Sequence, residues 1–195
     1  EVLGAHVQQK GSLVDHERLR FDFSHGEPMS TAQIEKVERL VNQQIRANNG
    51  VDTRLMDLEE ARAEGAAALF GERYEDEVRV VSMGEFSLEL CGGTHVHRTG
   101  DIGVFRITSE SGIAAGVRRV ESLTGEAAYQ HGMNESATLG RLATALKTGR
   151  ADVEERATSL ATRVRELERK IEQLQGQVAA GGAGDDAASE AQEGN

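Results

Sequence analysis

The feature that most limits how this chain can fold is a regular spacing of large apolar residues toward its C-terminal end. These residues step alternately by four and three positions, the a/d pattern of a coiled coil: Leu160, Val164, Leu167, Ile171, Leu174 and Val178. A seam of about three heptads has no core of its own and must pair to be buried. Its partner would be the helix that carries Leu139, Leu142 and Leu146, or a second copy in a homodimer. The alternative is one long surface helix.

Before residue 124 the pattern is that of an α+β domain. Leu19, Phe21 and Phe23 alternate with charged residues, as in a strand with one buried face. Further strands are predicted at 51–56, 78–81, 86–90, about 103–110 and 117–123, and 10–12 is predicted to be a turn. Ser30 and Gln33 form a capping box that starts a helix ending near residue 48, and a shorter helix is predicted at 58–63.

These patterns divide the chain into three parts. We expect an antiparallel-sheet domain with packed helices at 1–124 and a helical hairpin or coiled-coil stalk at 125–178. From residue 179 to 195, Gly, Ala, Ser, Asp and Glu dominate without large apolar residues. Because such a segment buries too little to offset the entropy of ordering, we expect a disordered tail.

Composition narrows the classes of protein to which the chain can belong. Its 195 residues contain one cysteine, so there is no disulfide framework. No apolar run is long enough to cross a bilayer, and no signal peptide opens the sequence, so we expect a cytoplasmic protein without a membrane partner. The net charge of −11 argues against indiscriminate nucleic-acid binding but permits a local basic patch, for which Arg118 and Arg119 after a glycine turn are candidates.

The only cysteine begins the motif Cys91-Gly92-Gly93-Thr94-His95. Thiolate and imidazole are both zinc ligands, and two glycines let the backbone bring them together. Zinc prefers four ligands, so the pair is half of a site. His97 stands two residues beyond His95, so both imidazoles would lie on one face of an extended segment, but His97 is left out of the ligand set. Two alternatives stay open: Cys91 is a small buried side chain, or it is a nucleophile with His95 or His97 as its base.

Several segments together resemble the editing domain of the alanyl-tRNA synthetase family. They are the run 89–125, with Cys91-Gly92-Gly93-Thr94-His95 and Ala115-Gly116-Val117-Arg118-Arg119, and the runs 6–14, 19–25 and 65–72. The resemblance is dense over residues 1–125. The helices beyond are similar to the start of the stalk that follows that domain, so the chain is identified as a fragment of a larger enzyme of protein biosynthesis.

The resemblance implies an activity that solves a selectivity problem. A pocket sized for alanine admits glycine and rejects serine poorly, so a second site hydrolyses the wrong product. The implied reaction is hydrolysis of serine or glycine from alanine tRNA at a Zn²⁺ ion held by Cys91 and His95, with tRNA bound at Arg118 and Arg119. Gln9 occupies an editing-sensitive position, where it would contact the serine hydroxyl or place the attacking water.

This sequence departs from the family in one important respect. The other two zinc ligands of the family are a His-x-x-x-His pair in a helix just before the segment where this chain begins, and the chain has no such pair. The ATP-dependent core that charges tRNA is also absent. We therefore expect the isolated chain to be a weak or inactive deacylase. Two other functions remain possible, a cysteine-dependent hydrolase and a non-catalytic fragment that binds tRNA and a coiled-coil partner.

Overall fold

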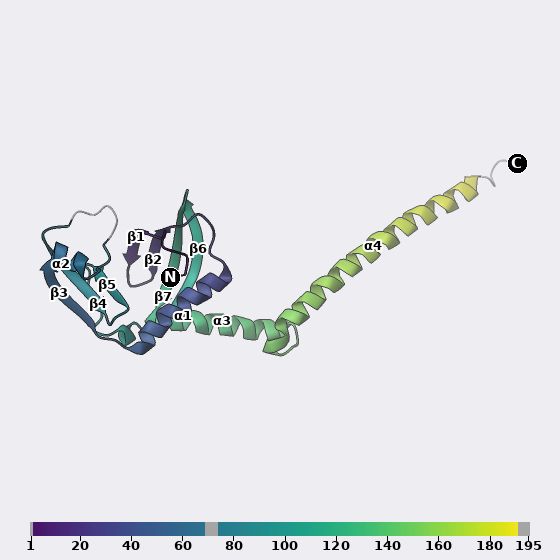
Figure 1. Ribbon diagram of the computed structural model, residues 1–195. Helices are drawn as coiled ribbons and strands as arrows, with labels where there is room; N and C mark the ends of the chain where they lie inside the picture. Colours follow the sequence, from purple (N-terminus) through teal and green to yellow (C-terminus); the bar gives the residue numbers. More distant parts are fainter. Residues whose placement is uncertain (1, 69–73, 191–195) are drawn as a thin grey trace. The chain divides into compact units, whose positions relative to one another are not determined.

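A computed structural model describes residues 2–68 and 74–190, with side chains described as far as residue 179 (Figure 1). The chain divides into two compact units, residues 1–133 and 134–195. The first contains two antiparallel sheets and their helices, and the second is helical. The α+β class predicted from the sequence is confirmed. None of the helices in the described part is long and apolar enough to cross a membrane.

The first sheet has four strands in the order β1-β2-β7-β6. Its strands are β1 (Gln9–Val14), β2 (Leu19–Ser24), β6 (Phe105–Ala114) and β7 (Val117–Thr124). The predicted turn at 10–12 is wrong, because these residues lie within β1, where Gly11 and Ser12 pair with β2. The glycine misled the prediction: Gly11 lies beside a β-bulge and opposite Asp22, where an added Cβ would lie 3.4 Å from a carboxylate oxygen.

Helix α1 (Thr31–Ala47) starts and ends as its sequence indicates. The Ser30 hydroxyl accepts the amide of Gln33, and the Gln33 side chain accepts the amide of Ser30. The C-cap residue Asn48 has a left-handed conformation with φ of 53°. Asn42 fixes the helix to β6, since its amide donates to the carbonyl of Phe105 at 2.8 Å and accepts the Phe105 amide at 2.9 Å.

The second sheet has three strands in the order β3-β4-β5. They are β3 (Val51–Asp57), β4 (Glu77–Met83) and β5 (Ser87–Leu90), and helix α2 (Leu58–Ala63) follows β3. A small core holds α2 on one face of this sheet and consists of Ala61, Val78, Val80 and Leu90. The Ala-rich stretch that the sequence places before Gly71 lies partly outside the described residues.

Helix α3 (Gly125–Ala145) leads from the first unit into the second. In the second unit a 3-10 turn, η2 (Arg150–Asp152), precedes the long helix α4 (Val153–Glu190). Arg150 donates to the Ser136 hydroxyl at 2.9 Å and so braces the turn between the helices. The seam of α4 is not buried in the described part of the chain, because its six apolar side chains are between 36% and 75% exposed.

Helix α4 continues through residues for which composition predicts disorder. It extends beyond Val178 to Glu190, and residues 191–195 lie outside the described part. Alanine recurs through this stretch and favours helix, whereas Gly181, Gly182 and Gly184 oppose it. Large apolar side chains are missing there, so this part of the helix has no seam with which to pair.

Candidate functional site

The cysteine of the motif comes directly after β5 and prolongs the pairing of β5 with β4. Val80 pairs with Leu90, and the Cys91 amide donates to the Arg79 carbonyl at 3.1 Å. Because side chains alternate along a strand, Cys91 and Glu89 lie on the face opposite to the buried Leu90. Cys91 is a free thiol and is partly buried.

The turn after Cys91 is held by an arginine that the sequence reasoning missed. Arg79 of β4 donates through Nη1 to the carbonyl oxygen of Cys91 at 3.2 Å and also to that of Gly93. Gly93 lies against the thiol, since a Cβ there would be 3.7 Å from Sγ of Cys91. A basic residue in an alternating strand gives no sign of this role, because the contact depends on the register between β4 and β5.

The histidine of the motif has an unusual environment. Nδ1 of His95 is buried and has no hydrogen-bond partner in the described part of the structure. A buried nitrogen without a partner costs free energy, and coordination of a metal ion would remove that cost. However, residues 2–68 and 74–190 contain no group of three or more His, Cys, Asp or Glu side chains arranged to hold a metal. Cys91 and His95 are donors of the type that zinc takes, and they would supply two of its four ligands.

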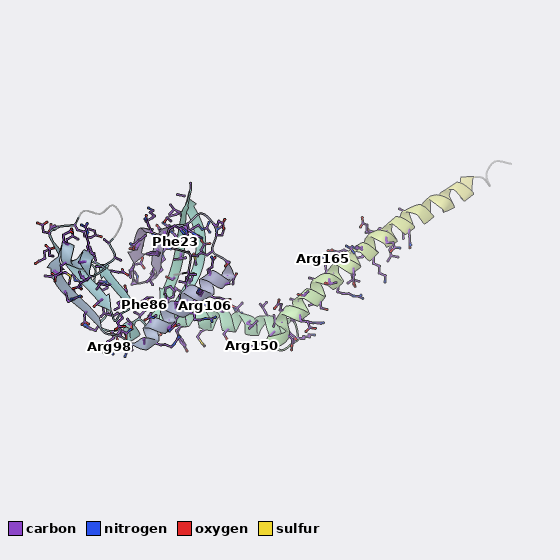
Figure 2. All side chains as sticks on the ribbon, in the orientation of Figure 1. Phe23, Phe86, Arg98, Arg106, Arg150 and Arg165 are labelled. Carbon is purple, nitrogen blue, oxygen red and sulfur yellow. The ribbon has the colours of Figure 1, made fainter. Side chains whose placement is uncertain are left out.

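The far end of the loop is attached to the end of α1. Arg98, labelled in Figure 2, donates through Nε to the Asn48 side chain at 3.1 Å and through Nη2 to the Asn48 carbonyl at 2.5 Å. The Thr99 hydroxyl accepts the Asn49 amide at 2.9 Å, and the 3-10 helix η1 (Thr99–Ile102) follows. The loop between β5 and η1 is thus fixed at both ends by hydrogen bonds.

A hollow of about 350 Å³ lies beside the motif. It is lined by the start of β1, by the segment after α2 and by the end of β5: Val7, Gln8, Gln9, Ala67, Ala68, Glu89 and Leu90. Leu90 is directly followed by Cys91, so the structure brings Gln9 near the start of the motif although they are far apart in sequence. The Gln9 amide donates to the Ser12 hydroxyl at 3.3 Å, and Gln9 keeps further capacity to donate and accept hydrogen bonds.

The two arginines predicted to contact tRNA lie on β7 of the first sheet, away from the motif. Each forms a two-point ion pair with a carboxylate of a neighbouring strand, Arg118 with Glu110 and Arg119 with Asp22. Hydrogen bonding to these carboxylates raises the pKa of both guanidinium groups. Phosphate would have to compete with the internal partners, and the tRNA contact stays a prediction.

The other histidines that could supply a ligand are placed differently. His6 hydrogen-bonds to His25, with Nε2 of the first 2.9 Å from Nδ1 of the second, and their rings are stacked. The carbonyl of His97 accepts the Val51 amide at 3.0 Å, and its side chain is exposed.

Comparison with known proteins shows what this arrangement is similar to. A domain described as the threonyl and alanyl tRNA synthetase second additional domain matches residues 78–121, which include β4, β5 and the motif. The alanine–tRNA ligase of Idiomarina loihiensis is 56% identical over 178 residues, 91% of this chain and 21% of the relative. The enzyme of Hydrogenovibrio crunogenus is 56% identical over 194 residues, the whole chain and 22% of the relative. That of Stenotrophomonas maltophilia is 54% identical over 185 residues, 95% of the chain and 21% of the relative.

The chain is homologous to a segment of the alanine–tRNA ligases. It spans about a fifth of the length of these relatives. The family resemblance inferred from the sequence is confirmed, and the matched domain covers the Cys91 loop, Arg79 and both arginines of β7. Gln9 and the long helix lie outside the matched domain but within the 194 residues that align with the relative from Hydrogenovibrio crunogenus.

Proposed function

We propose that the first unit is the editing domain of an alanine–tRNA ligase, which hydrolyses serine and glycine esters of alanine tRNA. The observation that supports this most directly is the position of Gln9, which lines the same hollow as the strand end that leads into Cys91. The hollow places a hydrogen-bonding side chain beside the end of β5, and the proposed metal ligands follow that strand directly in sequence.

The metal in this proposal is zinc, with Cys91 and His95 as two of its four ligands. The unpaired nitrogen of His95 and the thiol of Cys91 are donors of the right chemical type. Bound at such a site, zinc supplies a Lewis acid that polarises a carbonyl or lowers the pKa of water. The two remaining ligands would come from a His-x-x-x-His pair on a helix outside this chain.

The protein side chains have separate tasks in this proposal. Gln9 can donate to and accept from a serine hydroxyl, or hold the attacking water beside the ester carbonyl. A site built around that hydroxyl leaves polar groups unpaired when alanine enters, and so the correct product is spared. Arg118 and Arg119 would contact the tRNA backbone, and this role in protein synthesis would place the protein in the cytoplasm.

The second unit supports an additional role as an interaction segment. Its seam leaves six large apolar side chains exposed along one helix, and such a seam is normally buried against another helix. Pairing with a second copy of the chain would bury it. In the alternative proposal the chain is not an enzyme, and its functions are only this helix pairing and tRNA binding.

The test is release of labelled serine from alanine tRNA charged with serine. The chain as it stands should release serine slowly, and a version lengthened upstream by a helix with the His-x-x-x-His pair should bind zinc far more tightly and act faster. Cys91→Ala in the lengthened version should lose both properties. Equal rates with and without the added helix would refute completion of the zinc site, and no deacylation by either would leave only the non-catalytic alternative.

Activity that persists without metal but is abolished by alkylation of Cys91 would instead identify a cysteine nucleophile. A chelator therefore distinguishes the two mechanisms, because it should abolish deacylation that depends on zinc and leave deacylation by a cysteine nucleophile unchanged.

A further inference from the structure

The guanidinium group of Arg79 joins two carbonyl oxygens of the turn that carries the metal-ligand pair. It donates to Cys91 and to Gly93, and so closes the turn from the neighbouring strand. The backbone of Arg79 also accepts the amide of Cys91 at 3.1 Å. One residue therefore holds Cys91 through both its carbonyl and its amide, while an alanine at this position would keep only the backbone contact.

A turn with two consecutive glycines needs such an external contact to have one conformation. Gly92 has no atom within 4 Å of the position where a Cβ would lie, so its own surroundings do not fix it. Glycine also loses more conformational freedom on ordering than any other residue. Arg79 is partly buried, which strengthens its hydrogen bonds to carbonyl groups relative to those of an exposed arginine.

From this geometry we propose that Arg79 is the positioning residue of the Cys91–His95 pair. By holding the carbonyls of Cys91 and Gly93 together, its guanidinium fixes the backbone from which the thiol and the imidazole project. The metal ligands are then arranged before the metal arrives, and less entropy is lost on binding. This inference rests on the proposed zinc site for its functional meaning, but the turn itself can be measured without metal or tRNA.

The first experiment compares amide hydrogen exchange in the wild-type chain and in Arg79→Gln. The amide of Cys91, which donates to the Arg79 carbonyl at the start of the turn, should exchange about tenfold faster in the variant, because the turn opens locally, whereas those of Val80 and Leu90 should keep their protection. Arg79→Lys should restore part of the protection, since an ammonium group can donate to a carbonyl but lacks the planar fork. Arg54→Gln is the matched control, because Arg54 lies on β3 and is an exposed partner of Glu64.

The second experiment measures Cd²⁺ binding through the absorption of the cadmium–thiolate bond. Cys91 is the only cysteine, so the signal reports on this site alone. Arg79→Gln should weaken Cd²⁺ binding by about tenfold, which is the lower end of the effect of losing an outer-shell contact, and Arg79→Lys should recover part of it. Arg54→Gln should bind as the wild type does.

Three outcomes would overturn the proposal. They are unchanged exchange of the Cys91 amide in Arg79→Gln, equal loss of protection throughout the second sheet, and a looser turn with unaltered Cd²⁺ affinity. A wild-type chain that shows no cadmium–thiolate absorption would refute the zinc site instead, and the exchange comparison would still decide whether Arg79 fixes the turn.

Discussion

Asp22 of β2 and Arg119 of β7 face each other on adjacent strands and form a two-point ion pair. Nε of Arg119 is 2.6 Å from one carboxylate oxygen, and Nη2 is 2.8 Å from the other. Asp22 is only 7% exposed, and Nε of Arg20 lies 3.7 Å from the same carboxylate. The hydrogen bonds from Arg119 and the positive charges of both arginines lower the pKa of Asp22, against the opposing effect of burial.

This pair should make the stability of the first unit depend on pH in the acid range. The pKa of Asp22 is lower in the folded chain, so the stabilisation is complete above the unfolded pKa of about 3.9 and is lost as the pH falls through the folded value. Asp22→Asn should cost about 3 kcal/mol at neutral pH, the lower end for breaking a buried pair, and much less at low pH. Urea unfolding at the two pH values measures the difference.

Exposed Glu35 of α1 provides the control for this experiment. Glu35→Gln should leave both unfolding free energies close to those of the wild type. If Asp22→Asn destabilised the chain equally at neutral and low pH, the ion pair would not be the source of the pH dependence.

A second prediction concerns the attachment to α1 of the loop between β5 and η1. A Cβ at Gly100 would lie 2.5 Å from Oδ1 of Asn48, the atom that accepts the hydrogen bond from Arg98. Gly100→Ala should therefore displace Asn48 and cost roughly 1–3 kcal/mol, as overpacking does elsewhere. Gly26→Ala should be tolerated, because no atom lies within 4 Å of its Cβ position. Thermal unfolding of both variants would show no difference if the contact with Asn48 were unimportant.

The third prediction separates the helix of the second unit from its seam. Leu167→Pro should break α4 at a cost of about 3 kcal/mol and remove much of the helical circular dichroism. Amide exchange in the two sheets should not change. Leu167→Ala should keep the helix and, if two copies pair through the seam, reduce self-association in sedimentation. An unaltered dichroism spectrum of the proline variant would contradict the helix, and unaltered sedimentation of the alanine variant would contradict the pairing.

The fourth prediction uses the internal partner of Arg118 to test tRNA binding. Arg118→Ala should weaken binding and lower the slope of log affinity against log salt by about one. Glu110→Gln should do the opposite, because it frees the guanidinium for phosphate. If both substitutions left the salt slope unchanged, Arg118 would serve only to join β6 and β7.

Arg119 needs separate treatment, because its loss leaves the buried Asp22 unpaired. Changing both Arg118 and Arg119 to alanine should weaken tRNA binding further than Arg118→Ala alone. Before binding is measured, this variant must be shown to be folded. The Asp22→Asn/Arg119→Gln double variant provides that check, since it removes both charges together and leaves no buried carboxylate without its partner.

Elements that depend on local pattern could be predicted from the sequence. The capping box of Ser30 and Gln33 and the helix after residue 57 were found because their signals lie within a few residues of each other. The start of strand β1 was not predicted, because glycine is typical of turns. Gly11 is held in the strand by the pairing of β1 with β2, which exists only in the folded sheet. The division of the strands into two sheets depends on long-range pairing, which no local spacing encodes.

The same distinction between local and long-range signals holds for the candidate site. Cys91 and His95 stand four residues apart and could be recognised from the residues alone, whereas Gln9 was found only through the family resemblance. Its closeness to the end of β5 follows from how the two sheets are placed in the first unit. Arg79 could not be recognised, because its role depends on a register between strands and on carbonyl groups that every residue has.

The last prediction distinguishes the two roles open to Gln9, and it rests on the proposed editing reaction. If Gln9 contacts the serine hydroxyl, Gln9→Leu should slow serine release by about tenfold, the value of roughly one hydrogen bond, and leave glycine release almost unchanged, since glycine has no hydroxyl. If Gln9 holds the attacking water, both rates should fall together, because the same water attacks either ester.

Both rates would be measured in the version lengthened by the His-x-x-x-His helix, with saturating zinc. Gln8→Leu is the matched control, because Gln8 lines the same hollow and accepts from Lys10 at 3.5 Å. A control that slowed the reaction as much as Gln9→Leu would point to general damage of the hollow. If Gln9→Leu changed neither rate, Gln9 would contact neither the amino acid nor the attacking water, and both roles proposed for it would be refuted.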